Sequence, residues 1–487
     1  MKRWASFKPT RATWIGAGLF GICAGLYLGK FTNLQAWPVI SMLAILSVVA
    51  YKTKLKYVVL LLCVVAGCCT GLLRGQQFAM RVERYNKYFG ELVSVTGKVS
   101  DDAGYDKNKL TEFHLKDVKI NGASLPGRVR IRALSAIGAS RGDTIEAQGT
   151  LRQTLGTSRQ GSISYAQVTV LQNNTSWAES LRARFFTSIY SSLPEPQASL
   201  GLGYLVGVRT ALPQEFALVL SAVGLTHIVA VSGYNLTILV QFVKRIFEKV
   251  SAYQTVLFSV LLISGFLVMT GWSPSILRAA IISGFSLLAW YYGRSFQPLI
   301  IILIGAALTG FVNPLYIWGD VGWYLSFLAF TGVLLVAPLI LFFLGPKFAK
   351  NFLLLILLET LSAQLLTIPY IAYIFGRISV ISPLANMLIV PMIPISMLLV
   401  FVTGVVGMFS PALALWVAVP ARLIMTLTVW VVQKLGSVPW AQRTIELSLV
   451  HVIALYMIMA ITIVLGWLVY RRRTTCGHEE AIDWNLL

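Results

Sequence analysis

Charged residues are scarce in this chain of 487 residues: they make up 12% of it, against about 25% in an ordinary soluble domain. This scarcity excludes a soluble cytosolic enzyme of the same length. Acidic residues are rarer than basic ones: the chain has 19 Asp and Glu and 40 Lys and Arg, which gives a net charge of +21. Since 56% of the residues are hydrophobic, the composition indicates an integral membrane protein whose basic residues orient it or attract a polyanion.

Cysteine and histidine are also rare, with five and four residues. The cysteines show neither a disulfide framework nor a zinc spacing. The sequence contains no HExxH, no P-loop and no GxSxG with a supporting triad. We therefore predict no catalytic residue, no metal and no cofactor, and expect that the protein is not an enzyme.

Long apolar runs fall in two blocks, and a helix needs about 20 such residues to cross a bilayer. The first block has runs near 13–29, 34–50 and 55–73, and the second has about nine between 224 and 470. We predict a polytopic α-helical membrane protein with about 12 transmembrane helices, some broken or re-entrant. Basic clusters at the loops place both termini in the cytoplasm and the polar region between the blocks outside.

That polar region, about 90–172, has the alternating pattern of β-strands. Five such stretches are separated by turn signals such as NGASLPG and SRGD. Five short strands suit a small closed barrel such as an OB-fold. Within GRVRIR, Arg128, Arg130 and Arg132 share one face of a strand, which predicts a basic row over a packed apolar row.

Apolar residues then recur every fourth position from Trp177 to Leu193, which predicts an amphipathic helix lying in the outer interface. The predicted organisation is N-terminal transmembrane helices at 1–75, an extracytoplasmic OB-like β-domain at 76–175, the interfacial helix at 176–197, a transmembrane channel core at 198–473 and a short cytoplasmic tail at 474–487.

Polar residues inside the second block are candidate functional positions, because a charge at mid-bilayer costs about 2.5 to 3.5 kcal/mol. In GLTHIVAVSGYNLTIL, His227, Ser232 and Asn235 interrupt an apolar helix, and Gly233 offers a place to unwind it. His227 and Asn235 are eight residues apart and nearly share a face. They either line a pore or form hydrogen bonds between helices.

Four further positions extend this candidate pore. Ser275 gives a polar mouth near Arg278, which either holds a phosphate or anchors the span at the interface. Asp320 is positioned to pair with Arg278 or Arg209, or to cap a loop. Asn386 lies among helix-breaking prolines, a pattern found in cavity-lining helices as well as in simple kinks. The predicted channel-lining residues are His227, Ser232, Gly233, Asn235, Ser275, Arg278, Asp320 and Asn386.

The run GLTHIVAVSGYNLTIL resembles the signature GLxHLLAISGLH of the ComEC family of competence DNA-uptake channels. Other stretches resemble the family in the same order along the chain. LVGVRTALPQEF lies before the signature run, and SPSILRAA, DVGWYLSFLAF and TIPYIAYIFGRISVISPLANMLIVP lie after it. Asn235 stands where the family signature ends in His, and Tyr324 stands where Gln is usual. The resemblance covers nearly the whole chain but no metallo-β-lactamase-like domain, so it implies a short form without its own nuclease.

The resemblance implies a multi-pass channel in the bacterial cytoplasmic membrane that imports single-stranded DNA during natural transformation. It implies a passive pore served by a cytoplasmic DNA translocase or helicase, an extracytoplasmic DNA receptor and a separate nuclease, with membrane lipid around it. A basic OB-like face captures about 4 to 16 nucleotides, and Arg128, Arg130 and Arg132 are our candidates for it. The alternative is a secondary transporter of a small solute or polysaccharide with alternating access.

Overall fold

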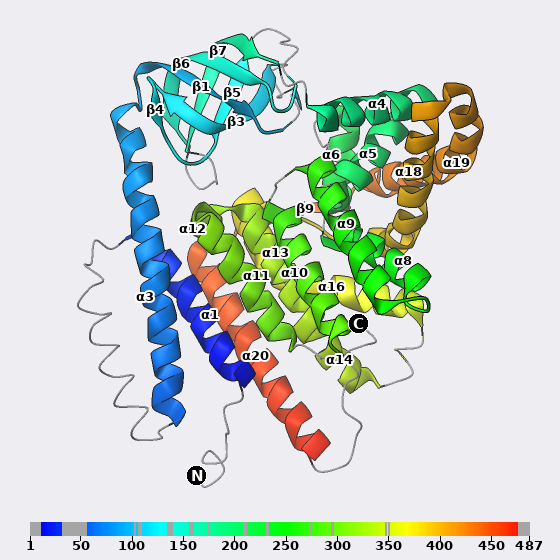
Figure 1. Ribbon diagram of the computed structural model, residues 1–487. Coiled ribbons are helices and arrows are strands. Elements are labelled where there is room, and N and C mark those ends of the chain that lie inside the picture. The colour runs from blue at the N-terminus through cyan, green and yellow to red at the C-terminus, as the bar shows by residue number, and fades with distance from the viewer. Residues whose placement is uncertain are drawn as a thin grey trace. The chain divides into compact units, whose positions relative to one another are not determined.

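The computed structural model divides into two compact units (Figure 1). The first comprises Met1–Glu179, Ser251–Val260 and Gly271–Tyr324, and the second comprises Ser180–Val250, Leu261–Thr270 and Leu325–Leu487. The structure describes residues 11–31, 56–101, 104–105, 110–133, 140–154, 160–173, 176–207, 212–229, 233–271, 274–293, 297–345, 348 and 351–475.

Helices make up most of the described chain. They are α1 (Arg11–Leu28), α3 (Lys56–Glu83), η2 (Arg84–Lys87), α4 (Trp177–Ser192), α5 (Gln197–Val206), α6 (Gln214–Val223), α7 (Thr226–Val229), α8 (Gly233–Phe247), α9 (Ala252–Thr270), α10 (Pro274–Tyr291), α11 (Pro298–Val312), α12 (Leu315–Gly319), α13 (Val321–Thr331), η3 (Gly332–Val336), α14 (Ala337–Leu344), α16 (Phe352–Phe375), α17 (Ser382–Ile389), η4 (Val390–Met392), α18 (Ile393–Phe409), α19 (Pro411–Gly436) and α20 (Leu449–Thr475).

Seven helical segments among the described residues are long and apolar enough to cross a membrane. They are Val59–Lys87, Ala252–Thr270, Val321–Leu344, Phe352–Phe375, Ser382–Phe409, Pro411–Gly436 and Leu449–Arg473, and four shorter apolar helices accompany them. The predicted multi-pass membrane protein is therefore confirmed. The predicted span at 34–50 lies outside the described residues, and the prediction of about 12 spans stays a prediction.

Small residues bring two helices of the first unit into backbone contact. Gly25 of α1 faces Cys68 of α3, and a methyl group added at Gly25 would overlap the backbone carbonyl of Cys68. Gly71 of α3 meets the backbone of α1 in the same way. Glycines four residues apart, such as Gly21 and Gly25, let membrane helices approach closely, so that their backbones pack against each other.

Proline interrupts the run at 382–409 of the second unit, as the sequence predicts, whereas α16 and α19 continue through Pro369 and Pro420. Residues 382–409 form α17, the 3₁₀ turn η4 and α18, because Pro391 and Pro394 have no amide hydrogen to donate to the preceding turn. A π-helical segment, η3, precedes Pro338 of α14 and packs its Gly332 against the backbone of α16. π-Helical segments are rare, and they occur frequently at functional sites.

The β-domain of the first unit is a seven-stranded sheet, and Figure 1 shows its labelled strands grouped together. The five long strands follow each other around a closed ring: β1 pairs with β3 and β6, β6 pairs with β7, and β7 pairs in parallel with β5, which pairs with β3. The strands are β1 (Leu92–Val99), β2 (Gly104–Tyr105), β3 (Thr111–Ile120), β4 (Ala123–Ser124), β5 (Val129–Ala133), β6 (Thr144–Gln153) and β7 (Gly161–Gln172).

The interior of the ring is the apolar core that the alternation predicts. Val95, Leu115, Ile131, Ile145 and Ile163, one from each long strand, are fully buried. All five predicted strands are therefore present in the structure. The short strands β2 and β4 are additions that the sequence pattern does not reveal, because two residues are too few to show a period.

Helix α4 packs into the core of the second unit over only part of its apolar stripe. Phe185 and Ile189 are buried, and Ser188 donates a hydrogen bond to the carbonyl of Gly404 in α18 at 3.0 Å. Trp177 at the start of the helix is 75% exposed. Arg182 lies off the stripe, yet it is buried and donates through Nε to the carbonyl of Met269 at 3.1 Å. The position of this helix at a membrane interface stays a prediction.

The remaining strands form a two-stranded antiparallel pair in the second unit, β8 (Arg377–Ser379) with β9 (Gln442–Thr444). This pair connects the end of α16 to the segment after α19, and Ile378 lies opposite Arg443. The sequence analysis did not anticipate these strands, because three residues carry too little pattern.

Candidate functional site

The basic row on β5 is arranged as its alternation predicts. Val129 and Ile131 are fully buried, whereas Arg130 and Arg132 have 21% and 25% of their side chains exposed. Arg128, immediately before the strand, is partly exposed as well. The two faces of the strand therefore separate an apolar interior from an outer row of guanidinium groups, which present both charge and planar donors to an anion.

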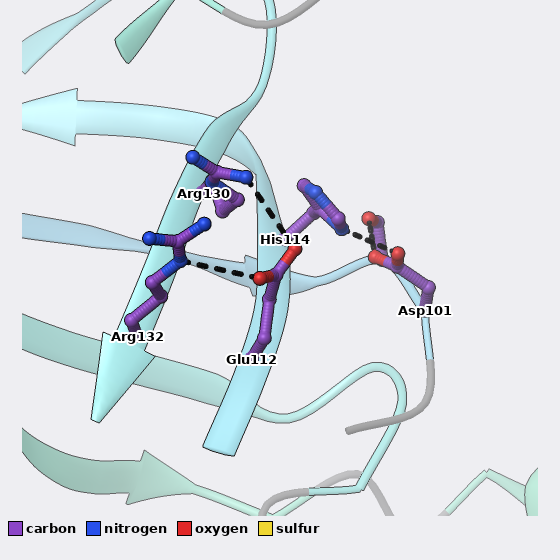
Figure 2. A network of polar contacts seen from close by, with 6 residues as sticks. Asp101, Glu112, His114, Arg130 and Arg132 are labelled. Carbon is purple, nitrogen blue, oxygen red and sulfur yellow. Dashed lines mark hydrogen bonds and ion pairs between the residues drawn. The ribbon is translucent and has the colours of Figure 1, made fainter. Parts of the chain in front are cut away.

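Glu112 on β3 neutralises part of this row, and the sequence analysis missed it. Strands β3 and β5 are antiparallel, with Glu112 opposite Arg132 and His114 opposite Arg130. Arg132 donates through Nε to Glu112 Oε2 at 3.3 Å, and Arg130 Nη1 lies 3.8 Å from Glu112 Oε1 (Figure 2). One carboxylate thus holds two of the three arginines in place and reduces the charge that the row offers to a polyanion.

His114 takes part in a second polar contact beside the arginines. Its Nδ1 lies 2.5 Å from Asp101 Oδ2, and Ser100 donates through its hydroxyl to Asp101 Oδ1 at 2.5 Å. Burial alone raises the pKa of Asp101, but the hydrogen bond and charge of His114, the hydrogen bond of Ser100 and the charge of Arg128 together lower it below its ordinary 3.8. Figure 2 shows the imidazole of His114 between Asp101 and the arginine row. The sequence spacing does not predict the contact of His114 with Asp101, because the pairing of strands brings these two residues together.

The signature run in the second unit places its polar residues in different surroundings. Asn235 is fully buried on α8 and donates through Nδ2 to the carbonyl of Tyr204 in α5 at 2.8 Å. His227 on α7 is exposed, with Nδ1 3.0 Å from the carbonyl of Gly224. Gly233 is the first residue of α8, and Ser232 lies outside the described residues. Of the two predicted alternatives, pore lining and a hydrogen bond between helices, Asn235 forms the hydrogen bond, and its side chain has no exposed surface.

Arg278 and Asp320 lie within electrostatic range of each other in the first unit. Arg278 on α10 is 4% exposed, while Ser275 one turn earlier is half-buried. Asp320 also accepts a hydrogen bond from the backbone amide of Trp323 at 2.7 Å and so caps α13. Asp320 therefore caps a helix, as one predicted alternative has it, and its charge acts on Arg278. Arg209, its other predicted partner, lies outside the described residues. Arg278 is buried, contrary to the predicted outward-reaching anchor.

Tyr324, the second departure from the family signature, makes a local contact. Its hydroxyl donates to the carbonyl of Ile317 in α12 at 2.5 Å. The side chain therefore holds α12 against the first turn of α13. In this chain the position serves the packing of two neighbouring helices.

Asn386 belongs to a group of buried polar residues near the broken helices of the second unit. It is 5% exposed on α17, and within the described part of the chain its Oδ1 accepts no hydrogen bond. One turn earlier, Ser382 accepts a hydrogen bond from Gln364 Nε2 of α16 at 2.7 Å. Polar side chains from α16 and α17 therefore lie close together within the packed helices of the second unit.

Glu359 is a further intramembrane residue that the sequence analysis did not single out. It is half-buried on α16, inside a segment apolar enough to cross a membrane. An ionisable residue in such a segment is a candidate functional position by default. The signal was available, because Glu359 is the one acidic residue between Phe352 and Phe375.

Comparisons with known proteins point to one family. A family model described as Competence protein matches residues 204–471. The chain is also 26% identical to ComE operon protein 3 of Bacillus subtilis (strain 168) over 214 residues, which are 44% of this chain. The match spans 27% of that relative's length. No solved structure matches the chain.

Proposed function

The chain belongs to the ComEC family of competence proteins, and from that premise we propose that it forms a cytoplasmic-membrane channel for the import of single-stranded DNA during natural transformation. The observation that carries the proposal is the family match over residues 204–471, which covers the helices with the buried polar residues. A DNA strand is charged at every nucleotide and cannot enter hydrocarbon, so its passage needs a polar path.

The β-domain is proposed to receive the strand outside the membrane. Its five long strands pair in a closed ring, which supports an OB-like fold, and OB-folds bind oligonucleotides on one face. The outer row of Arg128, Arg130 and Arg132 supplies cations on such a face. Glu112 holds two of them, which favours the weak, reversible contacts that a moving polymer needs.

The membrane helices are proposed to act as a passive pore. Arg278 and Asn386 are the buried polar residues best suited to contact the strand transiently. A separate cytoplasmic translocase or helicase would pull the strand, an extracytoplasmic receptor would deliver it, and a separate nuclease would degrade its complement. We further propose that both termini lie in the cytoplasm, that the β-domain lies outside, and that the chain itself catalyses no reaction.

Deletion of the gene, followed by uptake of labelled DNA, tests this function. We expect the deletion strain to bind DNA at its surface but to accumulate no nuclease-resistant label in the cytoplasm. Reintroduction of the intact gene should restore this label. A strain in which Arg130 and Arg132 are both replaced by Gln should show reduced uptake at normal protein abundance. Normal import of labelled DNA in the deletion strain would reject the channel.

A further inference from the structure

His114 is held in one orientation on the outer face of the β-domain. The residue is 9% exposed, and its contact with Asp101 fixes the position of the ring. Because a carboxylate only accepts, the proton of the neutral imidazole lies on Nδ1 and donates to Asp101. The neutral ring therefore presents Nε2 as an acceptor, and only the protonated ring presents Nε2 as a donor.

The Nε2 atom of His114 is buried and makes no hydrogen bond within the described part of the chain. Directly opposite on β5, the Nε atom of Arg130 is also buried without a hydrogen-bond partner there. A buried polar atom without a partner costs about 1 to 3 kcal/mol, so each such atom in a native protein requires an explanation. The Nε atom of Arg130 lacks an acceptor, and so does Nε2 of His114 when the ring is protonated, which indicates a ligand that supplies oxygen atoms.

A third nitrogen of this kind lies along the same face. The backbone amide of Gln160 donates to the carbonyl of Arg128 at 2.8 Å, which places Gln160 beside the basic row at the start of β7. Its side-chain Nε2 is buried and has no hydrogen-bond partner among the described residues. Residues of β3 and β5 and the residue before β7 thus place buried nitrogen atoms beside a row that already carries positive charge. An anion with several acceptor oxygens, such as a phosphate group, fits this chemistry.

We propose that protonated His114 is a ligand of the DNA phosphate backbone, donating through Nε2 to a phosphodiester oxygen beside Arg130, with Asp101 as the residue that positions it. The inference rests on the proposed function, since it assigns a proton-dependent contact to the strand that the β-domain receives. Because the protonated ring is the one that donates, binding of the strand takes up a proton. The affinity for single-stranded DNA therefore rises as the pH falls.

The charged groups near His114 are of both signs. They are the carboxylates of Asp101 and Glu112 and four basic side chains: Lys98 on β1, Lys116 on β3, Arg128 before β5 and Arg130 on β5. A bound phosphate would add negative charge next to Arg130 and so favour the protonated ring. Strand binding and protonation of His114 are therefore coupled.

The test uses the full chain in detergent and a labelled oligodeoxythymidylate in phosphate-free buffer. Affinity is measured by fluorescence anisotropy from pH 5.5 to pH 8 at constant ionic strength for the unmodified protein, H114Q and H451Q. His451 is exposed on α20 and serves as the matched control. We expect the unmodified protein and H451Q to bind about tenfold more tightly at the acid end, as a charge-assisted hydrogen bond allows. H114Q should lose this gain and bind within about twofold of the unmodified protein at pH 8.

Two further measurements keep the result decisive if H114Q does not fold. D101N should move the rise in affinity to lower pH, because the protonated ring loses its partner. Calorimetry of the unmodified protein in two buffers with different ionisation enthalpies should detect proton uptake on binding near pH 6.5. Binding without proton uptake, or an unchanged pH dependence in H114Q, would overturn the role of His114 while leaving the channel proposal intact. Absence of oligonucleotide binding at every pH would instead reject the β-domain as the receiving site.

Discussion

Arg132 donates to Glu112 across the β3–β5 pair at 3.3 Å, and the same carboxylate lies 3.8 Å from Arg130. The positive row on β5 therefore carries its own counter-charge. A phosphate that approaches these arginines competes with Glu112, which is the group that a DNA strand would have to displace.

We expect Glu112→Gln to strengthen binding of single-stranded DNA. Exposed ion pairs contribute about 0.2 to 1 kcal/mol, so the affinity should rise about two- to fivefold. The salt dependence should steepen by about 0.7 in the logarithmic slope for each additional phosphate contact. Anisotropy titrations at several salt concentrations measure both quantities, and E91Q, at an exposed glutamate before β1, is the control. A loss of affinity in E112Q would show that Glu112 orients the arginines rather than competing with the strand.

Asp101→Asn should destabilise the protein at neutral pH and not in acid. The pKa of Asp101 is lowered in the folded state, so its carboxylate stabilises the fold above about pH 4, and this contribution disappears as the pH falls through the folded pKa. Because 44% of the side chain is exposed, solvent screening limits the loss to about 1 kcal/mol. Thermal unfolding in detergent at pH 7 and pH 3 compares D101N with D117N, at an exposed aspartate. An equal loss of stability at both pH values would contradict the role of the charge.

Gly71→Ala should destabilise the contact between α1 and α3. The added methyl group would overlap the backbone of α1, and overpacking of this kind costs about 1 to 3 kcal/mol. The midpoint of thermal unfolding in detergent should fall. Gly265→Ala on α9 is the control, because the space around that position is open. Equal midpoints for the two variants would show that α1 and α3 separate without cost.

Arg278→Ala should reduce DNA import, and the double variant R278A/D320N shows whether the loss comes from strand contact or from lower stability. Removing Arg278 takes a positive charge away from Asp320, which destabilises the protein as well as removing a cation from the proposed path. The double variant R278A/D320N should recover thermal stability. Uptake of labelled DNA should stay low in both variants if Arg278 contacts the strand. Recovery of uptake together with stability would make Arg278 a structural residue only.

Residues that act through their own strand or helix were predictable, and residues that act across strands were not. The alternation of GRVRIR placed Arg130 and Arg132 outward, and the structure bears this out. Glu112 and His114 also follow an alternation, but nothing in the linear order states that β3 pairs with β5. The same limit applies to Asn235, whose hydrogen bond to Tyr204 depends on the packing of α8 against α5.

Composition and hydrophobic pattern were enough to establish a multi-pass membrane protein with an inserted β-domain, because a membrane span requires a run of about 20 apolar residues and a half-buried strand alternates with a period of two. Strand register and helix packing established the rest: the carboxylate between two arginines, the imidazole held by Asp101, and the glycine contact of α1 with α3. These features depend on which residues come into contact after the chain has folded. Contacts between segments that are distant in the sequence cannot be predicted from the linear order of residues.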